Sequence, residues 1–130
     1  MKITELQIGD WVIDGDYPAQ ITGITCDGEI ETTANEKTNI EMLEPIYITD
    51  DVLKDNGFKV FVEFKDVTYY KSEDGRVEMT SHEEMLNTFN EWSVHIDTED
   101  RRSMGYVEVT YLHQLQHILG LCEINIDFKL

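Results

Sequence analysis

Residues 109–122 contain no Asp, Glu, Lys or Arg, in a chain of which 28% is charged. Placed on a helical wheel, this segment has one apolar side, formed by Tyr111, Leu112, Leu115, Ile118, Leu119 and Cys122. The opposite side holds His113, Gln114, Gln116 and His117, together with Gly120. The spacing predicts an amphipathic helix at residues 110–121, and the rest of the chain must fold so that it covers the apolar side.

The polar side of this helix consists of His113, Gln114, Gln116 and His117, and we call it the polar helix face. A helix face in water usually carries charged residues, whereas this one carries none. We therefore expect the polar helix face to be covered as well, either by the first part of the chain or by another molecule.

The net charge limits the kinds of partner that the protein can have. The chain has 130 residues, with 10 basic and 27 acidic side chains and a net charge of −17. Phosphate-rich surfaces repel such a protein, so we expect no direct binding to nucleic acid or to an anionic membrane. The charge either keeps the protein soluble, or imitates nucleic acid and occupies the basic groove of a DNA- or RNA-binding protein. The first residues lack the apolar run of a signal peptide and no stretch is long enough to span a bilayer, which predicts a cytoplasmic location.

Residues 1–48 read as a small β-barrel. Short apolar runs separated by Gly and Asp predict five strands, the fourth at residues 38–42, and Gly23 marks a bulge in the long second strand. Short strands with one bent strand in so few residues are typical of an SH3-like barrel. Trp11 and Tyr17 either pack inside this barrel or line an exposed aromatic groove for a peptide.

Residues 49–130 are predicted to form an α+β subdomain. Thr49 begins a short helix that ends at Asn56-Gly57, and the spacing at residues 82–89 predicts another. Strands are expected at residues 60–70 with a bulge near 65–66, and at 76–80, 91–97, 104–109 and 124–128. The expected fold class is therefore α+β, with an antiparallel sheet of about five strands and the main amphipathic helix across one of its faces.

Few residues are arranged for catalysis. His113 and His117 have the spacing of two metal ligands on one helix, but no third ligand can be identified among so many carboxylates. No nucleophile elbow or phosphate-binding Gly-rich loop is present in the sequence. Cys26 and Cys122 lack a Cys-x-x-Cys partner, which predicts two reduced, buried thiols. We therefore expect no enzymatic activity, no cofactor and no bound metal.

Four motifs spread over the chain together resemble a known group of proteins. They are the Leu-x-Ile-Gly-x-Trp-Val of residues 6–12, the Leu-Glu-Pro-Ile of residues 43–46, the Asn-Gly-Phe of residues 56–58 and the His-Gln-Leu-Gln of residues 113–116. The group comprises small, acidic, uncharacterised proteins from gut anaerobes and their phages and mobile elements. The resemblance implies a phage or mobile-element context and carries no activity or site.

The hypothesis that these features favour is a non-enzymatic protein-interaction or adaptor protein. Its contact surface would be the polar helix face, through a protein partner or self-association. An acidic inhibitor that imitates nucleic acid is the first alternative. A metal-dependent hydrolase that uses His113 and His117 is the second.

Overall fold

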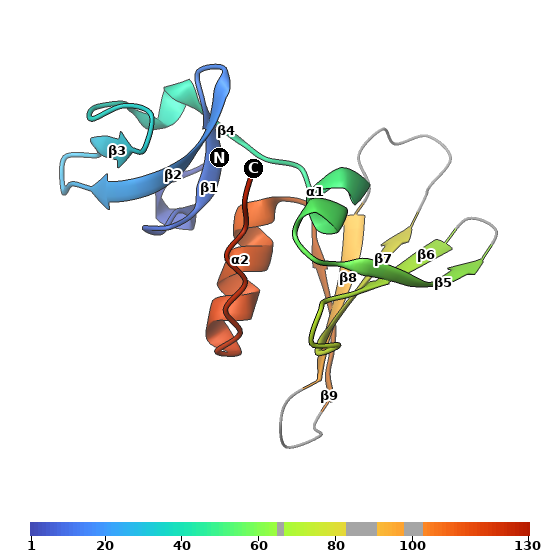
Figure 1. Cartoon of the computed structure of the whole chain (residues 1–130). Helices are drawn as coiled ribbons and strands as arrows, with labels where there is room; N and C mark the ends of the chain where they lie inside the picture. Colours follow the sequence, from blue (N-terminus) through green and yellow to red (C-terminus); the bar gives the residue numbers. More distant parts are fainter. Residues whose placement is uncertain (65–66, 83–90, 98–102) are drawn as a thin grey trace. The chain divides into compact units, whose positions relative to one another are not determined.

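A computed structural model of the chain describes residues 1–64, 67–82, 91–97 and 103–130 (Figure 1). They form two antiparallel sheets and one main helix, so the α+β class is confirmed. The chain divides into two compact units, the first of which comprises Met1–Ile46 and Tyr111–His117. The second comprises Tyr47–Thr110 and Ile118–Leu130. The predicted ranges 1–48 and 49–130 place the boundary slightly later and assign residues 111–117 to the second part.

The first unit contains a four-stranded sheet in the order β3-β2-β1-β4. Its strands are β1 (Trp11–Asp14), β2 (Tyr17–Ile24), β3 (Ile30–Thr32) and β4 (Leu43–Pro45), preceded by the 3-10 helix η1 (Ile3–Glu5). The pairing of β2 with β3 shifts register between Ile21 and Gly23, which confirms the predicted bulge. Throughout residues 1–46, all of which the structure describes, no strand pairing closes this sheet into a barrel.

One predicted strand of the first unit is wrong. Thr38 makes only an isolated bridge to Ile30, and Ile40–Met42 forms the 3-10 helix η2. The side chain of Asn39 caps η2, because its Oδ1 accepts a hydrogen bond of 3.0 Å from the backbone N–H of Glu41. Asn side chains compete in this way with strand pairing, and the alternation of residues 38–42 does not reveal it.

The core of the first unit lies under the sheet. Leu6, Val12, Ile21, Ile30 and Leu43 are buried there, and Ile3, Ile24 and Ile40 pack against them. Asp14 is also buried, and its Oδ2 accepts hydrogen bonds from Thr32 Oγ1 at 2.7 Å and Asn35 Nδ2 at 3.0 Å. A buried carboxylate without such donors would be costly, so these bonds allow an acidic residue in β1 to face the interior.

The second unit begins with the helix α1 (Asp50–Asp55), which confirms the first predicted helix. Thr49 Oγ1 accepts a hydrogen bond of 3.2 Å from the backbone N–H of Val52, as an N-cap does. At the other end Gly57 has φ +87°, and the backbone N–H of Phe58 donates to the carbonyl of Leu53 at 3.0 Å. Leu53 and Phe58 are both buried, so the helix ends in a Schellman motif with its apolar contact.

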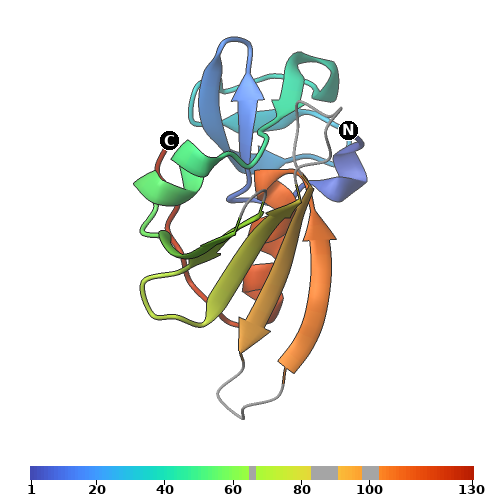
Figure 2. The ribbon, with the colours of Figure 1, turned by 90° about the vertical axis from the view of Figure 1, so that its right-hand side faces the viewer.

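Five strands form the sheet of the second unit, in the order β5-β6-β7-β8-β9 (Figure 2). They are β5 (Lys59–Phe64), β6 (Val67–Lys71), β7 (Val77–His82), β8 (Glu91–Asp97) and β9 (Ser103–Val109). The single long strand predicted at residues 60–70 is wrong, because β5 and β6 are separate strands that pair antiparallel. The predicted bulge at residues 65–66 lies outside the described residues, as does the predicted helix at 82–89 from residue 83 on.

Strand alternation divides the side chains of this sheet between two faces. Trp92, Val94 and Ile96 of β8 are buried on one face, as predicted, and their partners on β7 include the buried Met79 and Val77. The indole Nε1 of Trp92 donates a hydrogen bond of 2.9 Å to the carbonyl of Ile48. The other face of the sheet carries Tyr69, Thr80, Ser93 and Tyr106.

The helix α2 (Leu112–Leu121) confirms the predicted amphipathic helix. Its residues up to His117 belong to the first unit and those from Ile118 on belong to the second. Glu123, with φ +57°, follows the helix, and the N–H groups of Glu123 and Ile124 donate to the carbonyls of Gly120 and Leu119. α2 therefore ends in the same Schellman motif as α1, but without a glycine.

The strand predicted at residues 124–128 is wrong. Ile124 and Phe128 are buried, so the alternation of apolar residues is real, but the segment pairs with no strand that the structure describes. The side chain of Asn56 accepts a hydrogen bond of 2.7 Å from the backbone N–H of Lys129 and donates to its carbonyl at 3.2 Å. The segment is thus held by the burial of its side chains and by Asn56, and not by pairing with a strand as predicted.

Candidate functional site

The four residues of the polar helix face have different local roles, and Gln114 serves the helix itself. Its Oε1 accepts a hydrogen bond of 3.0 Å from the backbone N–H of Tyr111, the residue before α2. The backbone N–H of Gln114 in turn donates to the carbonyl of Tyr111 at 3.1 Å. This reciprocal pair satisfies a backbone donor at the helix start, as the third residue of a capping box does.

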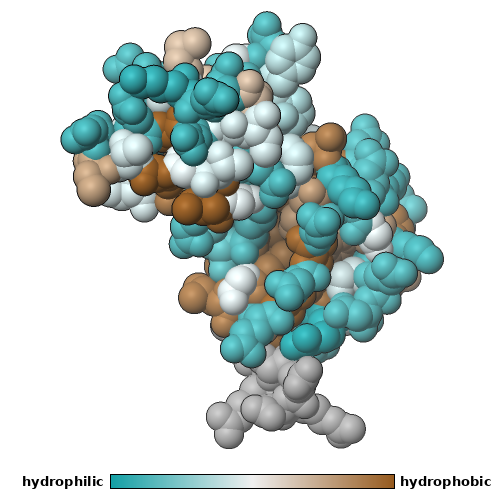
Figure 3. Space-filling view, turned by 60° about the vertical axis from the view of Figure 1, so that its left-hand side comes forward, coloured by the Kyte–Doolittle hydropathy of each residue, from teal (hydrophilic) through white to brown (hydrophobic). Residues whose placement is uncertain are grey.

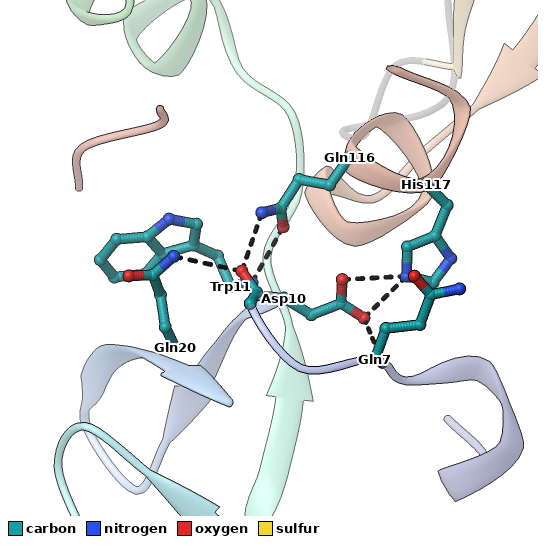
Figure 4. Close-up of polar contacts among 7 residues, drawn as sticks. Gln7, Asp10, Trp11, Gln20, Gln116 and His117 are labelled. Atoms are coloured by element: carbon teal, nitrogen blue, oxygen red, sulfur yellow. Dashed lines mark hydrogen bonds and ion pairs between the residues drawn. The ribbon is translucent and has the colours of Figure 1, made fainter. Parts of the chain in front are cut away.

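Gln116 binds the backbone of the first unit in the way that a neighbouring strand would (Figure 4). Its Oε1 accepts from the backbone N–H of Trp11 at 2.9 Å, and its Nε2 donates to the carbonyl of Gly9 at 3.0 Å. The same carbonyl accepts a second hydrogen bond, from Gln20 Nε2 at 3.2 Å. One side-chain amide therefore satisfies backbone groups on both sides of Asp10, at the beginning of β1.

His117 pairs with Asp10, the residue between Gly9 and Trp11. Its Nε2 lies 2.9 Å from Oδ1 and 2.8 Å from Oδ2 of Asp10, which also accepts a hydrogen bond of 2.8 Å from the backbone N–H of Gln7. The Asp10 side chain is only 4% exposed. A carboxylate so far from water requires donors, and His117 with Nε2 protonated is one of the two that the structure shows.

His113 is buried beside this pair. Its ring stacks on that of Tyr111, with centroids 5.8 Å apart and planes inclined by 7°, and it meets the His117 ring edge to face. Burial lowers the pKa of the His113 imidazole, because an apolar environment disfavours its charged form. The carboxylate of Asp10 opposes this shift, and His117 adds to it. Nδ1 of His113 is buried and makes no hydrogen bond to any residue that the structure describes.

Two residues of the polar helix face, Gln116 and His117, thus bond residues 9–11 of the same unit. Nε2 of His117 is directed at Asp10, and the imidazole of His113 is enclosed. In the part of the chain that the structure describes, no three His, Cys, Asp or Glu side chains gather as metal ligands. The geometry of this cluster is that of a structural link between a helix and a strand.

The other residues singled out from the sequence are Trp11, Tyr17, Cys26 and Cys122. Tyr17 is 72% exposed, so its packing inside a barrel is wrong, and Trp11 is half-buried. The indole Nε1 of Trp11 is enclosed without a hydrogen bond to the described residues. Cys26 and Cys122 are not joined in a disulfide, but Cys26 is exposed and Cys122 half-buried, which corrects the prediction that both are buried.

A second candidate site lies on the five-stranded sheet, on the face opposite the buried Trp92. Strand register places Tyr69, Thr80 and Ser93 side by side across β6, β7 and β8 on this face, which we call the outward sheet face. Tyr106 of β9 pairs with His95 on the same face, and their rings are 5.1 Å apart. On β5, the ring of Phe61 meets that of Tyr69 edge to face at 5.9 Å. Aromatic rings therefore stand on both sides of the small hydroxyl residues at the centre.

These residues surround a hollow of about 350 Å³. Among the described residues, its lining consists of Tyr69, Thr80, Ser93 and Tyr106. Thr80 and Ser93 are buried and form the floor, whereas Tyr106 is 69% exposed. The size is at the lower end of the range for small-ligand sites, so the hollow suits one extended side chain or a group of that size.

Sequence reasoning missed the outward sheet face, although one signal for it was present. The alternation of β8 assigns Trp92, Val94 and Ile96 to the core and therefore Ser93 and His95 to the other side. Successive side chains of a strand point to opposite faces, so one residue of the pair Tyr69-Tyr70 and one of the pair Tyr106-Val107 must lie on the same face as Ser93. Which residue of each pair lies on that face depends on the register between the strands, and the sequence alone does not determine this register.

Comparisons with known proteins add no identification. No family model matches the chain, and no curated protein or solved structure matches it. None of the helices described by the structure is long and apolar enough to cross a bilayer. The polar helix face and the outward sheet face are thus the features from which a function can be inferred.

Proposed function

We propose that this chain is a non-enzymatic protein-interaction protein that binds its partner through the outward sheet face. The observation that carries the proposal is the set of exposed aromatic rings on that face: Phe61 is 43%, Phe64 65% and Tyr106 69% exposed. Phe64 pairs with Val67 and therefore lies on the same side as Tyr69. Exposed apolar groups gathered on one face mark interaction sites, and aromatic residues dominate the energetics of such contacts.

The contacts of the polar helix face support this choice of surface. Gln116 and His117 already bond Gly9, Asp10 and Trp11 of their own unit, so a partner would have to displace those bonds to reach them. The aromatic rings of the outward sheet face require no such displacement. A partner that covers them gains apolar burial directly.

The partner is expected to carry positive charge. The chain has a net charge of −17, and strand alternation puts the carboxylates of Glu78, Glu91, Asp97 and Glu108 on the outward sheet face. On the face drawn in Figure 3, hydrophilic side chains cover much of each unit, with hydrophobic ones between them. A second copy of the chain would bring the same negative charge and be repelled, whereas a basic protein would be attracted. DNA- and RNA-binding proteins belong to that class, so the nucleic-acid-imitating inhibitor is a special case of this proposal.

Site-specific photo-crosslinking in the native host tests the proposal. A photoreactive phenylalanine analogue placed at Tyr106 should give adducts with one defined protein, identified by mass spectrometry and then bound again in purified form. The same analogue at Tyr17 is the matched control, because Tyr17 is exposed to a similar extent in the first unit. Adducts that are the same from both positions, or purified protein that does not bind, would rule the surface out.

We further propose that the first unit is related to SH3-like barrels and that the protein acts in a phage or mobile-element context. The bulge at Gly23 and the order β3-β2-β1-β4 support the first statement, and the sequence motifs described above support the second. An experimental structure whose β1–β4 superpose on no SH3-like barrel would contradict the barrel. The identity of the crosslinked protein tests the context.

A further inference from the structure

The hollow of the outward sheet face has aromatic walls that suit a flat cation. Tyr69 and Tyr106 stand on its two sides. Arginine stacks its planar guanidinium on aromatic rings, and the ring quadrupole attracts the positive charge. The face already holds one such contact, because Nζ of Lys71 lies 4.3 Å from the centroid of the Phe61 ring.

The floor of the hollow offers hydrogen-bond acceptors. Thr80 and Ser93, both buried, contribute hydroxyl groups from the two central strands. A hydroxyl oxygen has two lone pairs, so it can accept a hydrogen bond in addition to the bonds that it already makes. A guanidinium group carries five N–H donors and no acceptor, which matches a floor of this kind.

The rim of the hollow adds negative charge. Glu108 lies directly opposite Ser93 in the pairing of β8 with β9, and its side chain is exposed. Cross-strand partners on one face are close enough for their side chains to contact the same group. Glu78 also lies on this face, but its Oε1 is 3.5 Å from Nζ of Lys71. Glu108 is the cross-strand neighbour of the lining residue Ser93 and makes no ion pair with the described residues, so its carboxylate is the one beside the hollow that is left to a ligand.

From these three features we infer that the hollow binds an arginine side chain presented by a basic segment of the protein partner. The inference rests on the proposed function and specifies the chemistry of its contact. The tyrosines stack on the guanidinium, the hydroxyls of Thr80 and Ser93 accept from it, and Glu108 neutralises its charge. A volume of about 350 Å³ accommodates one long side chain and excludes a helix or a folded domain.

A titration of the full chain with defined peptides, followed by NMR, tests this inference. The probes are three acetylated and amidated pentapeptides with two glycines on each side of arginine, lysine or citrulline. Citrulline has the shape of arginine without the charge, and lysine has the charge without the planar group. The arginine peptide should shift the amide signals of Thr80, Ser93 and Tyr106 saturably, with a dissociation constant in roughly the millimolar range because so small a ligand makes few contacts.

The arginine peptide should bind about fivefold or more tightly than the citrulline peptide, and more tightly than the lysine peptide. Tyr106→Ala should weaken its binding about fivefold and Glu108→Gln about twofold, whereas Tyr17→Ala should leave it unchanged. Equal binding of the arginine and citrulline peptides, or no saturable shift on the outward sheet face, would overturn the inference. If crosslinking at Tyr106 still identifies a partner, the interaction function stands without the arginine contact, and if crosslinking fails as well, both are wrong.

Discussion

Nε2 of His117 lies 2.8 Å from Oδ2 of Asp10, a residue 107 positions earlier in the chain. The Asp10 side chain is 4% exposed, and its carboxylate also accepts from the backbone N–H of Gln7. In the second unit, His95 pairs with Asp97 at 3.2 Å, but that aspartate side chain is 57% exposed. Among the described residues, one His–Asp pair therefore has an enclosed aspartate and another has a solvated one.

His117→Ala should destabilise the first unit by about 2 kcal/mol, because it removes a donor from a buried carboxylate. His95→Ala, the matched control, should cost less than about 1 kcal/mol, since water can solvate Asp97. Urea unfolding followed by tryptophan fluorescence measures both, with Trp11 in the first unit and Trp92 in the second. Equal losses in the two variants would show that the burial of Asp10 has no energetic consequence.

Gln116→Glu should also destabilise the first unit, by about 2 kcal/mol. It replaces the Nε2 donor to Gly9 by an oxygen, so two acceptors face each other beside the Asp10 carboxylate. Gln114→Glu should stay within about 0.5 kcal/mol of wild type, because a glutamate oxygen can still accept from Tyr111 at the start of α2. Urea unfolding and far-ultraviolet circular dichroism would compare the pair, and similar stabilities would contradict the assigned roles.

His113 should make the first unit less stable in mild acid. Burial lowers the pKa of its imidazole in the folded state below the ordinary value of 6.5. As the pH falls below about 6.5, the unfolded chain binds a proton that the folded chain does not, so the free energy of unfolding decreases until the lowered folded pKa is reached. The decrease attributable to this one proton is at most about 1.4 kcal/mol per pH unit.

His113→Phe isolates this contribution, because it keeps a planar ring against Tyr111 and removes the titrating group. The pH dependence of urea unfolding between about pH 7.5 and 5.5 should be weaker in the variant. Asp10, Glu5 and His117 are present in both proteins, so the difference between the two slopes belongs to His113. Identical slopes would refute the assignment.

The two Schellman motifs predict that removing the glycine at the end of α1 lowers stability and that introducing a glycine at the end of α2 raises it. Gly57→Ala should destabilise α1 by about 1 kcal/mol, since φ at this position is +87°. Glu123→Gly should stabilise the end of α2 by about 0.5–1 kcal/mol, because the glutamate has φ +57°. Thermal unfolding of the single variants measures both signs. A destabilising Glu123→Gly would mean that its side chain contributes more than the backbone strain costs.

Phe128→Ala should destabilise the second unit by about 3 kcal/mol, because the ring is buried although its segment pairs with no described strand. Leu130→Ala should cost less than about 1 kcal/mol, since Leu130 is exposed. Urea unfolding of the two variants, observed through Trp92, tests the difference. A small effect of Phe128→Ala would mean that the C-terminal segment is not part of the core.

Elements with local signals were predictable from the sequence. Thr49, Asn56 and Gly57 mark both ends of α1 within a few residues, and the alternation around Trp92 defines the faces of β8. The β5–β6 hairpin lacked such a signal, because neither Gly nor Pro interrupts residues 59–71. For residues 124–128, the alternation correctly predicted buried positions but could not supply a partner strand.

The candidate sites depended more heavily on long-range information. The missing charge of residues 109–122 indicated that the polar helix face is covered, but nothing local pointed to Gly9, Asp10 and Trp11 as its contacts. Tyr69 and Tyr106 belong to strands that meet only through β7 and β8, so their convergence on one hollow follows from sheet order. Hydrophobic patterns with a period of two or 3.6 residues predict strands and helices, but they do not predict either of these long-range contacts.

The assignment of residues 111–117 to the first unit determines the order in which the protein can mature. During translation, the strands β1–β4 leave the ribosome long before the glutamine and histidine that bond their backbone have been synthesised. Residues 1–46 must therefore wait for residues 111–117, and a nascent chain that stops before residue 111 lacks the side chains that bond Gly9, Asp10 and Trp11. A chain that terminates before residue 111 would therefore lose part of the first unit as well as part of the second.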